Sequence, residues 1–131
     1  MIALPRKQDH QSLIKGLIDH FVSSGFQIQY ANYEGFDKPF VITRHAPDVI
    51  AVNPKNQLGC IGKVKLCSEL VEQATKEQFT DFSKILMKSG KSQGSKLPFF
   101  IGVPQECYSK IKQTYHDFDI SWRENIQVLG F

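Results

Sequence analysis

One carboxylate and two lysines in the middle of the chain have the residue types and spacing of a site for phosphate chemistry. Asp48 follows Pro47 at the start of an apolar stretch, and Lys63 and Lys65 lie two residues apart inside the next one. Residues i and i+2 of a strand project from the same face, so the lysines lie side by side, and a hairpin between the stretches places Asp48 across from them. Cleaving a phosphodiester requires carboxylates that hold Mg²⁺ and a lysine that stabilises the developing charge.

This pattern, Pro47-Asp48, fourteen intervening residues and Lys63-Val64-Lys65 before a helix, resembles the motif of the PD-(D/E)xK nucleases. The resemblance implies a restriction-endonuclease-like α/β fold, an α-β-β-β-α-β core with a mixed sheet flanked by helices, over a single domain of residues 1–131. It also implies a Mg²⁺- or Mn²⁺-dependent endonuclease of the restriction-enzyme or Holliday-junction-resolvase type that cleaves nucleic acid, DNA above all, and it admits a homodimer. By this resemblance Asp48 is the metal ligand and Lys65 the catalytic lysine.

Lys63 stands where the family carries the acidic residue of its (D/E)xK element. An ammonium group cannot ligate a divalent cation and repels it, so we expect weakened metal binding and impaired activity. Three explanations stay open: an altered active parent that carries glutamate at this position, a noncatalytic nucleic-acid-binding or protein-interaction module, and a second acid supplied by Glu69, Glu72 or Glu34. The alternative to all three is that Asp48 merely begins a strand and that the lysines form its solvated face.

Other family members carry an acidic residue on the first helix that points at the metal, and a glutamine on the helix after the motif. By resemblance, Asp9 or its neighbour His10 takes the position on the first helix, and Asp9 would be a second metal ligand. Gln78 takes the position on the helix after the motif and would contact nucleic acid. The alternatives are a helix N-terminal charge for Asp9 and an ordinary surface amide for Gln78.

Two stretches without acids, residues 49–68 and 85–96, carry only lysines as charges, and we expect them to form one positive face. Lys91 and Lys96 of the second stretch are candidates for phosphate contacts, and His45, three residues before Asp48, is a candidate for the scissile phosphate. A solvated loop and an exposed histidine before a strand are the alternatives.

These residues need a sheet and helices to position them, and the hydrophobic periodicity predicts the order α-β-β-β-α-β-α-β. The predicted helices cover residues 6–24, 68–88 and 104–118, and the predicted strands cover 26–33, 47–53, 58–66, 97–103 and 125–131. Gly25 ends the first helix, and the second buries a stripe that begins at Val71. The last strand is expected at a sheet edge.

Length and composition fit one globular domain. The 131 residues are 41% hydrophobic and 22% charged, and no apolar run approaches the roughly 20 residues of a membrane span. A net charge of +3 is too small by itself to indicate nucleic acid. Met1–Lys7 lacks the apolar region of a secretory signal, so we expect a cytoplasmic protein with no membrane partner.

The three cysteines predict no cross-link. Cys60, Cys67 and Cys107 are odd in number and show no CxxC spacing, which argues against a disulfide framework and against a zinc cage. We expect buried free thiols.

Overall fold

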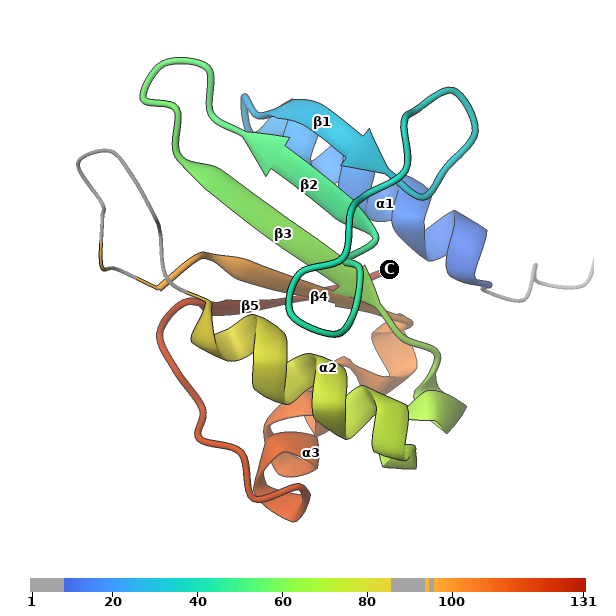
Figure 1. Ribbon diagram of the computed structural model, residues 1–131. Coiled ribbons are helices and arrows are strands. Elements are labelled where there is room, and N and C mark those ends of the chain that lie inside the picture. Colours follow the sequence, from blue (N-terminus) through green and yellow to red (C-terminus); the bar gives the residue numbers. More distant parts are fainter. Residues whose placement is uncertain (1–8, 86–93, 95) are drawn as a thin grey trace, which may run out of the picture.

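A mixed β-sheet forms the centre of this computed structural model, which describes residues 9–85, 94 and 96–131. Within these residues the sheet has five strands in the order β1-β2-β3-β4-β5. Helix α1 (His10–Ser23) covers one face, and α2 (Gln73–Lys84) and α3 (Ile111–Asp117) cover the other (Figure 1). The strands are β1 (Gln27–Ala31), β2 (Val49–Val52), β3 (Gly59–Val64), β4 (Phe99–Val103) and β5 (Ile126–Gly130). The expected α/β class and mixed sheet flanked by helices are confirmed.

The strand pairing changes from antiparallel to parallel at β3. Strands β1, β2 and β3 pair antiparallel, and β3, β4 and β5 pair parallel. The turn between β2 and β3 is closed by the Asn53 N–H, which donates to the Leu58 carbonyl at 2.8 Å, and Asn53 Oδ1 accepts from the Lys55 N–H at 2.9 Å. The predicted hairpin is therefore confirmed, as is the edge position of the last strand.

Helix α1 begins and ends where local chemistry dictates. Asp9 is its N-cap residue and accepts the Ser12 N–H at 2.8 Å, which satisfies one of the unpaired donors of the first turn. After the helix, Gly25 adopts φ 89°, and the Phe26 N–H donates back to the Phe21 carbonyl at 2.9 Å. The predicted stop at Gly25 is confirmed.

Alternation along the central strands builds two cores. Val49 and Ala51 of β2 face α1, and Ile50 faces α2. The close approach of α1 requires glycine at position 62, because a Cβ there would lie 2.9 Å from Leu17 Cδ1. Ile61 of β3 also faces α2. Asp48, two residues before Ile50, and Lys63, two residues after Ile61, therefore lie on the α2 side of the sheet.

The prediction of a second helix over residues 68–88 was wrong for its first turns. Residues Cys67–Val71 form a 3₁₀ helix, η1, and Glu72 is extended (φ −82°, ψ 147°), so α2 begins only at Gln73. The Glu69 carbonyl accepts the Glu72 N–H at 3.1 Å, as in a 3₁₀ turn, and the Thr75 hydroxyl at 2.6 Å. Val71, expected in the buried stripe, is 85% exposed as a result.

The expectation of free thiols was wrong for two of the three cysteines. Cys67 of η1 forms a disulfide with Cys107 of η2 (Gln105–Lys110), the 3₁₀ helix before α3, and Cys60 alone is a buried free thiol among the described residues. The partners are 40 residues apart, and only packing of η1 against the α3 region brings their Cα atoms to 5.8 Å. None of the described helices has the length and apolar character needed to cross a membrane.

Candidate functional site

Asp48 and Lys63 face each other across the β2–β3 ladder, as their spacing predicted. The register pairs Val49 with Gly62, and the Asp48 N–H donates to the Gly62 carbonyl at 2.8 Å, so the next position on β3 is Lys63. Lys63 Nζ lies 3.6 Å from Asp48 Oδ1. The other oxygen, Asp48 Oδ2, accepts the Val64 N–H at 2.9 Å, and Asp48 is only 6% exposed.

The Lys63 ammonium group is held by backbone as well as by charge. Lys63 Nζ donates to the Ala46 carbonyl at 3.2 Å, in the segment that leads into β2. The Asp48 carboxylate is therefore flanked by an internal cation on one side and by a backbone donor on the other. Neither the Ala46 carbonyl nor the Val64 N–H carries a signal in the sequence, because every residue has a backbone carbonyl and every residue except proline has a backbone N–H.

Lys65 directly follows the last residue of β3 and is buried. Its side chain is only 5% exposed, and its N–H donates to the Gly102 carbonyl at 3.0 Å. Burial lowers the pKa of Lys65, and the Lys63 charge lowers it further, against the opposing effect of Glu69, Asp48 and Glu72. The lysine pair predicted on one strand face is present, with its two ammonium groups in each other's field.

Glu69 of η1 is the acid that joins this group. Glu69 Oε1 accepts the Leu66 N–H at 2.7 Å and lies 2.6 Å from His10 Nε2 at the start of α1. Burial acts to raise the pKa of Glu69, but these two hydrogen bonds and the charges of His10 and Lys65 together lower it below its ordinary value. Helix α1 thus reaches the site through His10, one of the two residues expected there, and not through Asp9.

A divalent cation does not fit this arrangement as the side chains lie. One Asp48 oxygen faces the Lys63 ammonium and the other binds a backbone N–H. Within residues 9–85, 94 and 96–131, no cluster of three or more His, Cys, Asp or Glu side chains is placed to hold a metal. Of the other acids considered, Glu72 is exposed at the start of α2, and Glu34 lines a separate hollow with Gln11 and Lys38.

Of three further candidates, Asp9 and His45 have contacts of their own. Asp9 caps α1 through Ser12, which is the helix-terminal role that its position left open. His45 Nε2 lies 3.6 Å from Glu77 Oε1 of α2. Gln78, next on α2, has a buried Oε1 atom without a hydrogen-bond partner in the described part of the chain. No contact joins His45 or Gln78 to Asp48 in the described structure, so their roles toward nucleic acid stay predictions.

Among the described lysines of the two acid-free stretches, Lys96 lies away from Asp48, so the expected single positive face stays a prediction. Lys91 lies outside the described residues, and Lys96 precedes β4 at the opposite end of the sheet. Since Ile61 pairs with Phe99, Lys96 is level with position 58, seven residues before Lys65, or about 23 Å at roughly 3.3 Å per residue. Any contact of Lys96 with phosphate therefore belongs to another part of the surface.

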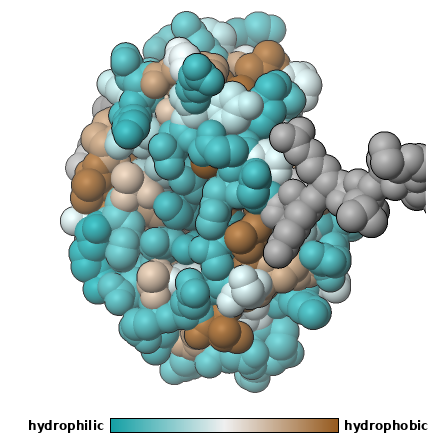
Figure 2. Space-filling model, turned by 90° about the vertical axis from the view of Figure 1, so that its right-hand side faces the viewer, coloured by the Kyte–Doolittle hydropathy of each residue, from teal (hydrophilic) through white to brown (hydrophobic). Residues whose placement is uncertain are grey.

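The surface on the side of the α1 N-terminus is largely polar. Figure 2 shows hydrophilic side chains over most of this face, with hydrophobic ones in small separate groups. Such a face favours a polar or charged ligand over a broad apolar contact.

Comparison with known proteins adds no further assignment. No family model, no curated protein and no solved structure matches the chain. The functional conclusion therefore depends on the geometry around Asp48, Lys63, Lys65 and Glu69.

Proposed function

We propose that this chain is a noncatalytic nucleic-acid-binding domain with the architecture of the PD-(D/E)xK nucleases, in which the Lys63 ammonium group takes the place of the metal. The observation that carries this proposal is the 3.6 Å approach of Lys63 Nζ to Asp48 Oδ1. In the nucleases that this chain resembles, the aspartate at this position holds a divalent cation. In this chain, Asp48 instead faces the ammonium group of Lys63.

An ammonium group can link a carboxylate to a phosphate, but it cannot perform the metal's chemistry. Lysine has three N–H donors, and the contacts to the Ala46 carbonyl and to Asp48 leave capacity for a phosphate oxygen. Unlike a metal ion, it carries a single charge and does not activate a bound water. Binding without cleavage is the expected consequence, and DNA is the expected partner.

A Mg²⁺-dependent endonuclease that uses Glu69 as its second acid is the other candidate. Glu69 favours it, because its lowered pKa keeps the carboxylate ionised and its charge acts on Lys65. This candidate requires Lys63 to move away from Asp48 when the metal binds. It therefore predicts cleavage by the unaltered protein, which the first candidate excludes.

Fluorescence anisotropy tests the binding proposal. Labelled duplex, four-way-junction and single-stranded DNA, and single-stranded RNA, are titrated with protein in EDTA at several salt concentrations. We expect salt-dependent binding to at least one of them, and a loss of about tenfold or more for Lys63→Met, because a hydrogen bond to a charged group contributes about 1.5–3 kcal/mol. Lys55→Gln removes an exposed lysine from the β2–β3 turn and is the matched control. Equal binding by Lys63→Met and the unaltered protein contradicts the proposal.

Cleavage assays with Mg²⁺ or Mn²⁺ separate the two candidates. The unaltered protein is compared with Lys63→Glu on the substrate that binds. The proposal expects no cleavage by the unaltered protein and predicts metal binding, with gain of cleavage, for Lys63→Glu. Cleavage by the unaltered protein that Glu69→Gln abolishes would instead establish the endonuclease candidate.

A further inference from the structure

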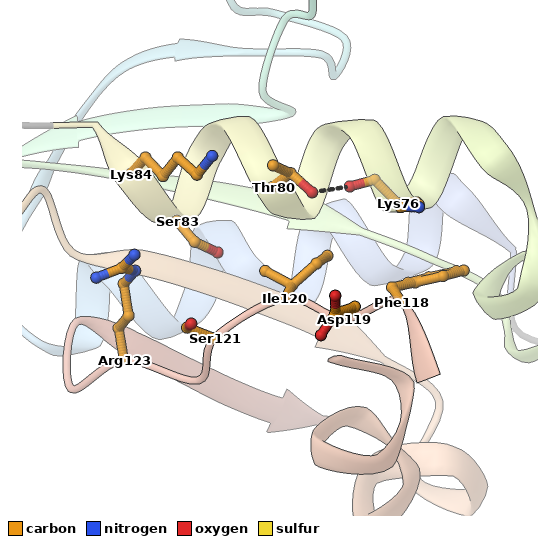
Figure 3. A pocket seen from close by; sticks show the side chains of 9 residues that line it. All are labelled: Lys76, Thr80, Ser83, Lys84, Phe118, Asp119, Ile120, Ser121 and Arg123. Carbon is orange, nitrogen blue, oxygen red and sulfur yellow. Dashed lines mark hydrogen bonds between the residues drawn. The ribbon is translucent and has the colours of Figure 1, made fainter. Parts of the chain in front are cut away.

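A second group of cations lies between α2 and the segment that joins α3 to β5. Lys76 and Lys84 come from α2 and Arg123 from the joining segment, and all three line a pocket of about 400 Å³ (Figure 3). Arg123 also borders a neighbouring hollow that contains Lys96. The pocket lies toward the β5 edge of the sheet, whereas Asp48 lies at the start of β2, so the two sites share no residue.

The positive charge of this pocket is not balanced by the protein. In the part of the chain that the structure describes, Lys76, Lys84 and Arg123 form no ion pair. Arg44 differs, since it pairs with two acids of α2. Asp119 is the one carboxylate among the lining residues, which leaves an excess of cations that suits an anionic ligand.

The walls of the pocket are anchored before any ligand arrives. The Ile120 N–H donates to the Tyr115 carbonyl at 2.9 Å, and Asn125 Nδ2 donates to the Ser83 carbonyl at 3.2 Å. The Trp122 ring contacts the Tyr115 ring edge-on, with 5.1 Å between centroids. These contacts tie the joining segment to α2 and α3, so binding costs little reorganisation of the backbone.

The shape of the pocket separates its chemical groups. Lys84 and Arg123 lie at one end, Phe118 and Lys76 lie toward the other, and Asp119 lies between the two ends, nearer Phe118 (Figure 3). The volume is within the range of small-ligand sites. Two cations suit a phosphate, an aromatic face suits a nucleobase, and a carboxylate can accept hydrogen bonds from sugar hydroxyl groups.

We propose that this pocket binds a nucleoside monophosphate, with the phosphate at Lys84 and Arg123 and the base against Phe118. The same chemistry is offered by a free nucleotide and by the phosphorylated end of a strand. The inference is independent of the proposed function, because none of its residues belongs to the group around Asp48.

Calorimetric titration with AMP tests this assignment, with adenosine and inorganic phosphate as partial ligands. We expect AMP to bind more tightly than either fragment. Arg123→Gln and Lys84→Gln should each weaken AMP about tenfold, whereas Phe118→Leu should weaken AMP and leave phosphate unchanged. Lys55→Gln is the control for loss of an exposed lysine, and circular dichroism checks the fold of each variant. AMP binding no tighter than phosphate, or unchanged by Arg123→Gln and Lys84→Gln, would overturn the proposal.

Two further arms identify the source of the nucleotide and separate this site from the Asp48 group. Competition by AMP against a 5′-phosphorylated oligonucleotide, but not against its unphosphorylated form, assigns the pocket to strand ends. AMP binding without such competition assigns it to free nucleotide. Lys63→Met should leave AMP affinity unchanged. If Lys63→Met weakens AMP binding as much as Arg123→Gln does, the conclusion that this pocket is separate from the Asp48 group is overturned.

Discussion

The pairing of Asp48 with Lys63 should appear as a measurable coupling energy. In a double-mutant cycle, Asp48→Asn removes the carboxylate charge and keeps an acceptor for the Val64 N–H, whereas Lys63→Met removes the ammonium and keeps most of the side-chain stem. Each single variant leaves one charge without its partner, and the double variant removes both charges. The cycle therefore isolates the attraction between the two side chains.

The expected size follows from the distance and the burial. At 3.6 Å, two unit charges attract with about 4.6 kcal/mol at an effective dielectric constant of about 20. The Asp48 side chain is 8% exposed and that of Lys63 is 16% exposed, so residual solvent screening reduces this value. We expect a coupling energy of about 1–3 kcal/mol in the free energy of unfolding, well above that of a surface pair.

Urea unfolding at neutral pH, followed by circular dichroism, measures this coupling energy. The same cycle on Lys15 and Asp19, an exposed pair one turn apart on α1, is the control and should show a much smaller coupling. A coupling energy near zero would show that Lys63 is not the counter-ion of Asp48. It would also refute the proposal that the Lys63 ammonium group takes the place of the metal.

Three further predictions concern stability. Gly62→Ala should destabilise the protein by about 1–3 kcal/mol because its Cβ would press on α1, whereas Gly59→Ala, where the nearest atom is at 3.6 Å, should cost less. Reduction of the Cys67–Cys107 disulfide, which closes a 40-residue separation, should lower the free energy of unfolding by about 4 kcal/mol on a chain-entropy estimate. The pKa of Glu69 is lowered in the folded protein, so the stability that its carboxylate contributes is complete above the ordinary pKa of 4.5 and is lost as the pH falls through the folded-state pKa. The free energy of unfolding of Glu69→Gln should therefore depend less on pH in this acid range than that of the unaltered protein.

Urea unfolding also checks these three predictions. Equal losses for Gly62→Ala and Gly59→Ala would contradict the close contact of β3 with α1. Unchanged stability after treatment with a phosphine reductant, with both thiols titrating as free, would contradict the contribution of the disulfide. An acid limb identical in Glu69→Gln and the unaltered protein would show that the Leu66 and His10 contacts do not hold the carboxylate ionised.

Local sequence was enough to determine the order of the strands, the first helix and the pairing of the motif residues, but not the start of the second helix. Apolar periodicity located α1, Gly25 set its end, and a short turn forced β2 and β3 into a hairpin. The start of α1 was predicted too early, because Asp9, inside the predicted helix, is extended and caps a helix that begins at His10. Once a hairpin and its alternation are given, Asp48 has to face Lys63, and Lys65 has to follow on the same side. These conclusions needed only interactions between residues close in the chain or paired by one turn.

Contacts between distant segments were decided by the tertiary structure alone. The Cys67–Cys107 disulfide, the break of the second helix at Glu72 and the link from His10 to Glu69 all depend on how η1 packs against other elements. Sequence spacing carries no signal for such neighbours, because chain separations of 40 and 59 residues are closed by packing of the whole core. The same reason separates Lys96 from Lys65, since a parallel strand begins at the opposite end of the sheet from the site.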